Sequence, residues 1–279
     1  MRTRIITGMI AAALFLSLLF FAPSVCFKIA VMAACVLAMY EVLVAVGFKK
    51  YPFLMVCGCA FGALAPWYTI LATLGARVAI AGVGALALVV VIAAIALYEK
   101  LPVERLGLLF FLSLIIPLGF AALAYLRDND DNIHGIFYVL VAVALPWMSD
   151  IGAYFAGTFF GKHKLCPKIS PKKTVEGLIG GFVASIVFNV LVAWGYQQWY
   201  LIPYDKGQVS FLSVILIAIV VVPLSVIGDL FASVIKRQFG IKDYGNILPG
   251  HGGILDRCDS LIFAVPVFYL FDLFLPIIR

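Results

Sequence analysis

Apolar runs long enough to cross a lipid bilayer follow one another along almost the whole chain. A helix that crosses the hydrocarbon layer needs roughly 20 mostly apolar residues. Only helices and closed barrels satisfy their backbone hydrogen bonds in lipid, and no barrel-type alternation is present. The predicted fold is therefore all-α, a polytopic integral membrane protein with about nine transmembrane helices. We expect these helices at residues 5–22, 25–47, 53–74, 78–98, 106–126, 133–160, 177–197, 209–235 and 258–278.

The composition supports the same class, because polar side chains are too few to cover a water-facing surface. Hydrophobic residues make up 65% of the chain and charged residues only 12%. Soluble domains carry about 25% charged residues. No polar segment is long enough to fold alone, so we expect one membrane-embedded protein without a soluble domain.

Lysine and arginine are distributed unevenly between the two ends of the predicted helices. With a cytoplasmic N-terminus, 15 of the 20 Lys and Arg residues fall on the cytoplasmic side. This asymmetry follows the positive-inside rule and supports that orientation. A basic cytoplasmic face suits anionic headgroups or nucleotide phosphates. No basic amphipathic helix or aromatic-interleaved patch indicates nucleic acid. The remaining five residues are Lys28 within a helix and, on the outer side, Arg77, Arg127, Lys206 and Arg279.

The side chains that could do chemistry gather in two cytoplasmic segments and the helix ends beside them, residues 150–177 and 228–260. The first half of the chain carries few such residues, chiefly Glu41, Glu99 and Glu104. Its expected role is packing and lipid contact. The candidates in the first segment are Asp150, Ser170, Lys172, Lys173, Thr174 and Glu176.

Spacing places several side chains of the second segment on common helix faces. Asp229, Ser233 and Lys236 fall at i, i+4 and i+7, and therefore share one face. Asp256 and Asp259 fall at i and i+3 where the last helix begins. A carboxylate in an apolar helix is costly unless it is paired, so Asp229 is expected to have a cationic partner.

A glycine-rich turn lies between these two helices, with Gly250, Gly252 and Gly253 around His251. Glycine lets the backbone approach a ligand closely, and exposed N–H groups can hold phosphate. Carboxylates suit Mg²⁺, which proteins bind with one or two carboxylates plus substrate phosphates. Cationic side chains suit the remaining phosphate oxygens. The set predicts phosphoryl or nucleotidyl transfer, in which positioning and charge neutralisation dominate. The cationic candidates are Lys236, Arg237, Lys242 and Arg257.

Each feature alone has an ordinary structural explanation. A basic loop after a membrane helix is a common topogenic signal. Asp256 and Asp259 can stabilise the N-terminal dipole of the last helix, and Asp229 can pair with Lys236. The whole set, together with the glycine turn, favours a functional site.

The segment from Ser233 to Asp259, SVIKRQFGIKDYGNILPGHGGILDRCD, resembles the motif of the phosphatidate cytidylyltransferases, also called CDP-diacylglycerol synthases. Residues 150–177 are similar to a second region of that family. In residues 1–130 only hydrophobicity is shared. The chain departs from the commoner pattern at Ile151, Ala232 and Gly245, none of which is assigned to metal or phosphate.

The resemblance implies a nucleotidyltransferase of phospholipid biosynthesis that converts CTP and phosphatidic acid to CDP-diacylglycerol and pyrophosphate. It also implies Mg²⁺, alone or with a second cation, and a homodimer. Its metal ligands are implied at Asp229 and Asp256, and we expect Asp259 to assist. The expected location is a bacterial inner membrane, with the active site at the cytoplasmic face and no nucleic-acid partner.

The expected site divides by role. Residues 131–279 would form the catalytic region with two cytoplasmic motif loops, and residues 1–130 the packing helices. The catalytic candidates are Asp229, Lys236, Arg237, Asp256, Arg257 and Asp259. The metal candidates are Asp229, Asp256 and Asp259. The substrate-binding candidates are Asp150, Ser170, Lys172, Lys173, Thr174, Glu176, Ser233, Lys242, Asp243, Gly250, His251, Gly252 and Gly253.

Three alternatives remain open at this point. A CTP-dependent kinase of polyisoprenoid or phytol-type alcohols would release CDP and would need a base for the hydroxyl group. The same cytidylyl transfer could act on another lipid phosphate, such as an archaeal ether lipid. An anion transporter would tend to show internal repeats and charges near the bilayer midplane. The charges of this chain lie at the cytoplasmic helix ends, which counts against transport.

Overall fold

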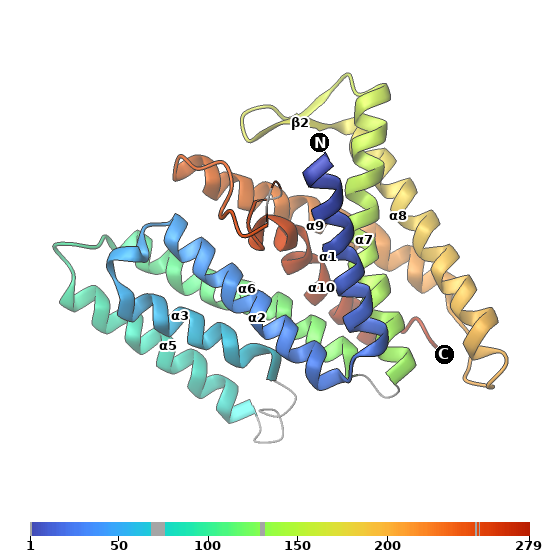
Figure 1. The fold of residues 1–279 in the computed structure, drawn as a ribbon, viewed down its shortest axis with the longest axis horizontal. Helices are drawn as coiled ribbons and strands as arrows, with labels where there is room; N and C mark the ends of the chain where they lie inside the picture. Colours follow the sequence, from blue (N-terminus) through green and yellow to red (C-terminus); the bar gives the residue numbers. More distant parts are fainter. Residues whose placement is uncertain (1, 68–75, 129–131, 249, 251) are drawn as a thin grey trace. The chain divides into compact units, whose positions relative to one another are not determined.

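The computed structural model describes residues 2–67, 76–128, 132–248, 250 and 252–279, and it is mainly helical (Figure 1). Two compact units divide the chain. The first unit comprises Met1–Asp128 with Gln238–Cys258, and the second comprises Asn129–Arg237 with Asp259–Arg279. The predicted boundary between residues 130 and 131 lies outside the described residues. In chain order the elements are α1 (Arg2–Phe21), α2 (Ser24–Ala45), η1 (Phe48–Lys50), α3 (Pro52–Leu64), η2 (Ala65–Trp67), α5 (Ala76–Ala96), α6 (Val103–Arg127), α7 (Asn132–Phe160), β1 (Lys164–Cys166), β2 (Ser170–Thr174), α8 (Val175–Tyr196), η3 (Gln197–Leu201), α9 (Phe211–Gln238) and α10 (Leu255–Phe274).

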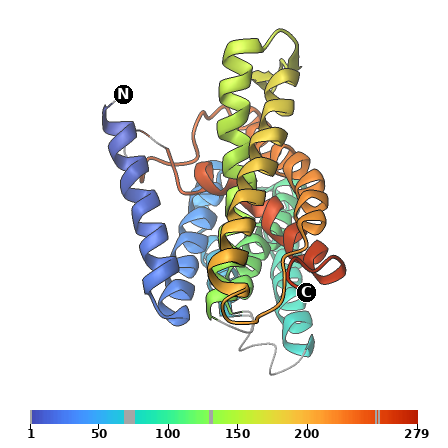
Figure 2. The same ribbon diagram turned by 90° about the vertical axis from the view of Figure 1, so that its right-hand side faces the viewer.

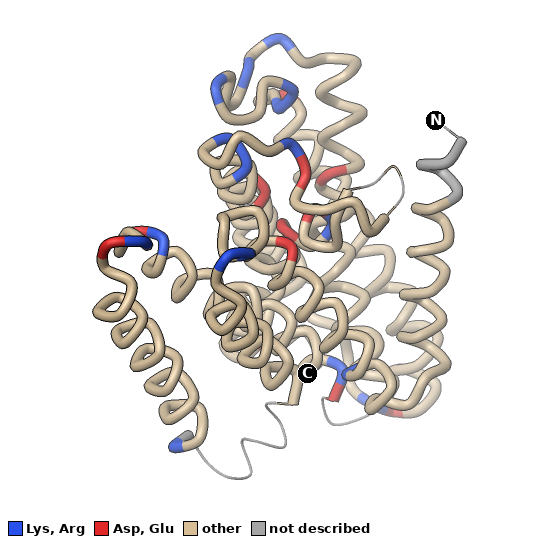
Figure 3. Tube along the Cα trace, turned by 60° about the vertical axis from the view of Figure 1, so that its left-hand side comes forward, with Lys and Arg blue, Asp and Glu red and all other residues tan. Residues whose placement is uncertain are grey.

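The chain is a helical, multi-pass membrane protein. Charged residues gather mostly in loops and at helix ends, leaving long uncharged stretches of helix (Figure 3). Two further apolar segments are shorter within the residues that were described fully: Thr7–Phe21, which is part of α1, and Pro52–Trp67. Among the described residues, six helices are long and apolar enough to cross a membrane: Ser24–Ala45, Arg77–Ala96, Val103–Arg127, Ile133–Phe160, Val175–Leu201 and Phe211–Gln238.

The predicted number of nine spans is therefore not confirmed. Helix α10 has 20 residues but carries Asp256, Arg257, Asp259 and Asp272, which sets it apart from the six apolar helices. The last part of the predicted span at 53–74 lies outside the described residues. Proline occurs inside α6, α7, α9 and α10, as membrane helices tolerate when neighbouring groups satisfy the freed carbonyl.

In the first unit, α2 packs against α3 and α6, and small residues of α3 allow the close approach (Figure 1). A methyl group at Gly62 would lie 3.0 Å from Met39 Cγ, and one at Gly58 would lie 2.9 Å from Leu43 Cδ1. Both α2 side chains are fully buried. Small residues thus let this face of α2 form the core of the unit, as is common between membrane helices.

At the other end of α2, an ion pair provides a partner for Lys28, the one cation predicted to lie within a span. Lys28, 7% exposed, pairs with Asp128 just after α6. The neighbouring Arg127 is 1% exposed and donates hydrogen bonds to the carbonyls of Leu19 and Ala22, each at 3.4 Å. Because a buried charge is costly without a partner, these contacts tie the end of α1 to α2 and α6.

In the second unit, α7 and α8 run side by side over most of their length (Figure 2). A methyl group at Gly180 would overlap Ala156, and one at Gly181 would lie 2.7 Å from the Ser149 carbonyl oxygen. The Ser185 hydroxyl donates a 2.9 Å hydrogen bond to the Leu145 carbonyl further along the same seam. The partners shift in opposite directions along the two helices, so the pair is antiparallel.

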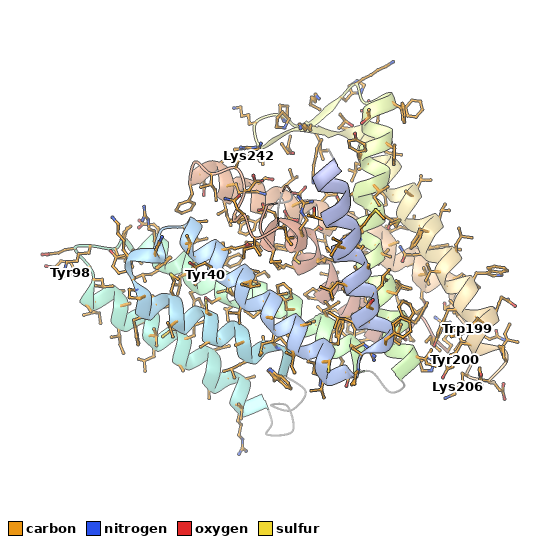
Figure 4. All side chains as sticks on the ribbon, in the orientation of Figure 1. Tyr40, Tyr98, Trp199, Tyr200, Lys206 and Lys242 are labelled. Atoms are coloured by element: carbon orange, nitrogen blue, oxygen red, sulfur yellow. The ribbon has the colours of Figure 1, made fainter. Side chains whose placement is uncertain are left out.

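Aromatic side chains gather at the C-terminal end of α8, where Trp199 and Tyr200 lie near Lys206 (Figure 4). The Tyr196 hydroxyl and His134 Nδ1 are joined by a hydrogen bond of 2.6 Å, and the Tyr196 ring stacks on Phe137 at 4.1 Å. Trp199 is 71% exposed. Tyrosine and tryptophan favour the membrane–water interface, which agrees with the predicted outer side at Lys206.

A two-stranded hairpin occupies the predicted cytoplasmic loop between α7 and α8, and it was not predicted. Strands β1 and β2 pair antiparallel, with Lys164 opposite Thr174 and Cys166 opposite Ser170. The strands are short and polar, without the apolar alternation that identifies a strand in sequence. Their pairing gives the basic loop a defined conformation.

The close contact between α7 and α8 can be tested with matched glycine substitutions in α8. Gly180→Ala should destabilise the protein by about 1–3 kcal/mol, because the added methyl group overpacks the seam. Gly195→Ala is the control, because no atom lies within 4 Å of the added methyl group there. Thermal unfolding in detergent measures both, and equal midpoints for the two variants would contradict this packing.

Candidate active site

The C-terminal end of α9 approaches α10 closely within the second unit, and a glycine makes this possible. A methyl group at Gly228 would lie 2.9 Å from the Asp259 carbonyl oxygen and 2.7 Å from Phe263 Cδ2. The rings of Phe231 and Phe263 meet edge to face at 5.8 Å. The approach brings Asp229, next to Gly228, toward Asp259.

Asp229 has the cationic partner that its apolar helix predicts, and the partner comes from the hairpin. Lys173 Nζ lies 2.6 Å from Asp229 Oδ2, although the two groups are not aligned as a hydrogen bond. The two side chains are 21% and 28% exposed. Arg237 Nε donates a 3.4 Å hydrogen bond to the Ile169 carbonyl in the hairpin turn. The two polar segments predicted from sequence therefore meet in the second unit.

The carboxyl group of Asp259 also lies in the electric field of Asp229. The charges of Asp229, Lys236 and Asp150 all act on its carboxyl group, and its Oδ1 accepts a 2.8 Å hydrogen bond from the Ser260 N–H. We call the set Asp150, Lys173, Asp229, Lys236 and Asp259 the acidic–basic cluster. It holds three carboxylates and two ammonium groups, so that it can accept both a cation and phosphate oxygens.

The donor set fits Mg²⁺ only when a substrate shares it. Within the described ranges, no group of three or more His, Cys, Asp or Glu side chains is arranged to hold a metal ion. Asp229 and Asp259 nevertheless supply two carboxylates, and the charge of Asp229 acts on the carboxyl group of Asp259. Mg²⁺ is commonly held by one or two carboxylates plus substrate phosphates. The residues therefore fit a Mg²⁺ ion shared with a nucleotide, rather than one bound by protein alone.

The hairpin is fixed to the start of α8 by a helix cap and a carboxylate clasp. Thr174 is the N-cap residue, and its hydroxyl accepts a 3.1 Å hydrogen bond from the Gly177 N–H. Glu176 accepts hydrogen bonds from the His163 N–H at 3.2 Å and lies 2.6 Å from His163 Nδ1. Thr174 and Glu176 therefore have a structural role, because their contacts hold in place the strand that carries Lys173.

The glycine motif belongs to the first unit, where its backbone folds around Asp256. Asp256 Oδ2 accepts hydrogen bonds from the Tyr244 N–H at 2.8 Å and the Gly253 N–H at 3.0 Å. The Leu248 N–H donates to the Gly252 carbonyl at 2.9 Å, which closes the turn. Gly252 has φ +86° and Gly250 has φ +77°, a left-handed conformation that glycine adopts readily.

A carboxylate from the first half of the chain also joins this motif. Glu41 of α2 is 3% exposed and accepts hydrogen bonds from the Ile254 N–H at 3.0 Å and the Leu255 N–H at 2.9 Å. Glu41 lies in the half of the chain for which packing and lipid contact were the expected role. Its signal was present, because an acid inside an apolar run needs a partner as much as Asp229 does.

The remaining predicted residues lie in the helices and strands named above or in the segment between α9 and α10. Ser233 follows Asp229 by one turn of α9 and is partly buried, as is Ser170 at the start of β2. His251 lies outside the described residues. The exposed candidates are Asp150, Lys172, Arg237, Lys242, Asp243, Gly250 and Arg257.

Basic groups thus lie beside paired carboxylates at the ends of membrane helices, which is a site suited to phosphate chemistry on a membrane lipid. Comparison with known proteins agrees with this class. The sequence pattern of the cytidylyltransferase family matches residues 2–275. The chain therefore belongs to the cytidylyltransferase family.

Three relatives show how far the similarity extends. The phosphatidate cytidylyltransferase of Haemophilus influenzae is 42% identical over 171 residues, 61% of this chain and 58% of the relative. That of Staphylococcus saprophyticus is 36% identical over 174 residues, 61% of this chain and 62% of the relative. That of Bacillus subtilis is 32% identical over 275 residues, 96% of each chain. The matched part thus spans less than two thirds of the first two relatives and nearly all of the third.

The hairpin anchor can be tested by trypsin, because lysines line the hairpin. Thr174→Val removes the N-cap, which costs about 1 kcal/mol, so the hairpin should open and be cleaved about fivefold faster. Thr158→Val is the matched control, since the Thr158 hydroxyl donates to the Tyr154 carbonyl within α7 and caps nothing. Equal cleavage rates at residues 162–173 in both variants would show that the cap does not anchor the hairpin.

Proposed function

We propose that the chain is a phosphatidate cytidylyltransferase, which joins CTP and phosphatidic acid to form CDP-diacylglycerol and pyrophosphate. The observation that carries this proposal is the contact between Lys173 and Asp229, because it joins two polar segments far apart in sequence into one acidic–basic cluster. Family membership and the names of the relatives support the substrates.

In the proposed reaction, an oxygen of the phosphatidate phosphate forms a bond to the α-phosphorus of CTP. The bond from that phosphorus to the bridging oxygen of the β-phosphate breaks, and pyrophosphate leaves. Phosphatidate carries an ionised oxygen near pH 7, so the site needs no strong base. The main task is to bring two anions together, which positioned cations achieve by offsetting their repulsion.

The cationic side chains of the second unit suit this task. Lys173 and Lys236 lie within the acidic–basic cluster, and their chain neighbours Lys172 and Arg237 are exposed. We assign them to phosphate oxygens of CTP and phosphatidate, with Ser170 and Ser233 as neutral donors. The acyl chains would remain in the bilayer.

We propose Mg²⁺ as the cofactor, with Asp229 and Asp259 as its protein ligands in the second unit. When bound, it would neutralise phosphate charge and polarise the α-phosphate. The assignment of Asp256 as a ligand stays a prediction, and its Oδ2 already accepts two backbone hydrogen bonds. A second cation and a homodimer also stay predictions.

For the residues of the first unit, we propose substrate binding by the glycine motif. Lys242, Asp243 and Arg257 are exposed there, and Gly252 and Gly253 shape the backbone. Arg257 follows directly after Asp256, whose hydrogen bonds fix the turn. A fixed turn can present a guanidinium group without the entropy cost of ordering it at each turnover.

We place the enzyme in a bacterial inner membrane with the site at the cytoplasmic face. The distribution of Lys and Arg supports this orientation. The hydrogen bonds from the motif backbone to Glu41 agree with it, because the end of α2 that carries Glu41 also precedes Lys49 and Lys50. The bacterial relatives support the organism class.

The reaction can be measured directly with purified protein in detergent. With CTP, Mg²⁺ and phosphatidic acid, the protein should release pyrophosphate, and release should require the lipid. Formation of CDP with an isoprenoid alcohol, without pyrophosphate, would instead assign the chain to the lipid kinases. If the protein turns over neither phosphatidic acid nor the isoprenoid alcohol, both enzyme assignments are refuted and transport becomes the leading alternative.

Carboxylate variants test the acidic–basic cluster. Asp229→Asn and Asp259→Asn should each lower kcat by about 10²–10³, as removal of a transition-state electrostatic contact does. Asp272→Asn is the matched control, because Asp272 also lies on α10 but accepts a 3.0 Å hydrogen bond from Ile277, which asparagine can retain. Asp256→Asn should also lower pyrophosphate release. A full rate in Asp229→Asn would remove Asp229 from the mechanism.

A further inference from the structure

Glu41 occupies an unusual place for a residue in the packing half of the chain. It lies near the end of α2, yet its carboxylate accepts hydrogen bonds from backbone groups 213 and 214 residues further along the chain. Those groups belong to Ile254 and Leu255, which directly precede Asp256. The first N–H groups of a helix have no partner within it, and here a buried side chain of another helix supplies one.

The surrounding glycines are shaped to this carboxylate. A methyl group at Gly253 would overlap Glu41 Oε2, and one at Gly245 would overlap Glu41 Oε1. Neither glycine has a positive φ, so backbone conformation does not require glycine at these positions. Glycine is required there because a larger residue would occupy the space of the Glu41 carboxylate. Gly245 is also one of the three positions at which the chain departs from the commoner pattern of the family that it resembles.

The contact is costly to break from either side. Removal of Glu41 would leave two N–H groups without their partner, and displacement of the loop would leave a carboxylate unpaired in an apolar helix. Two hydrogen bonds to one charged acceptor, each close to 3 Å, also fix the position of the backbone at Ile254 and Leu255 more narrowly than a general electrostatic attraction would. The held segment includes Gly253, whose N–H donates to Asp256.

We propose that Glu41 is a positioning residue for the reaction: its carboxylate fixes the backbone before Asp256 and Arg257, and thereby sets where these two side chains are presented. This inference rests on the proposed function for its effect on turnover. The effect on the loop itself does not depend on which reaction the site performs.

Glu41→Gln is the sharpest single change. Glutamine keeps the size of the side chain but points an NH₂ group at one of the two backbone N–H groups, so one hydrogen bond becomes a repulsive contact. The loop should shift, and a shift of about 1 Å at a reacting group can lower the rate by about 10²-fold. We expect kcat to fall more than the KM for CTP rises, with Glu41→Asp recovering part of the loss.

Hydrogen exchange measures the loop independently of activity. In Glu41→Gln, the amides of Ile254 and Leu255 should exchange at least about tenfold faster, because their acceptor is lost. Lys28→Met is the matched control, because Lys28 is also a buried ion of α2 but pairs with Asp128, far from the motif. It should leave those amides and kcat per folded protein unchanged, even if it lowers the melting temperature.

A double-mutant cycle separates positioning from general destabilisation. Gly253→Ala should lower kcat strongly in the wild-type background, because the methyl group displaces the Glu41 carboxylate. In a Glu41→Ala background the same change should cost less than about threefold, since the two positions are coupled. Additive losses, or unchanged exchange at Ile254 and Leu255, would overturn the proposal. A wild-type protein without turnover would refute the proposed function, while the exchange data would still decide the role of Glu41.

Discussion

The cost of a charge in an apolar helix governs where this chain places its polar side chains. Glu41, Lys28 and Asp229 each lie on a helix long and apolar enough to cross a membrane, and each has a partner of opposite charge or a pair of backbone donors. In lipid these contacts are obligatory, because water cannot replace them. The partners of Glu41 and Asp229 lie far away in sequence but in the same unit. The requirement that stabilises these two charges therefore also joins distant segments of the chain within each unit.

Close approach of the backbone at glycine is the second feature on which the packing of this chain depends. Gly180 lets α8 lie against α7, and Gly228 lets α9 reach the backbone of Asp259. Gly253 leaves room for the Glu41 carboxylate. Between membrane helices the hydrophobic effect contributes little to association, so small residues and buried polar contacts carry the specificity.

Helical spans and basic segments could be predicted from the sequence, because both depend on local composition. The partner of Asp229 could not be predicted in this way. The helical spacing within α9 indicated Lys236, whereas the contact comes from Lys173 in the hairpin. That hairpin consists of short polar strands that no periodicity marks. Glu41 was underrated because its neighbours in sequence are apolar and its partners lie 213 and 214 residues away. The principle applied to Asp229 would have found it.

Partial exposure of the acidic–basic cluster argues for chemistry rather than transport. The side chains of Lys173 and Asp229 are 21% and 28% exposed, whereas those of the structural pair Lys28 and Asp128 are 8% and 20% exposed. Full burial would strengthen the pair but exclude a nucleotide, and full exposure would weaken it by solvent screening. Intermediate exposure in the C-terminal half of α9 leaves the charges only partly shielded and accessible to a ligand. The proposed transfer between two phosphate-bearing substrates requires this combination of strong charges and access.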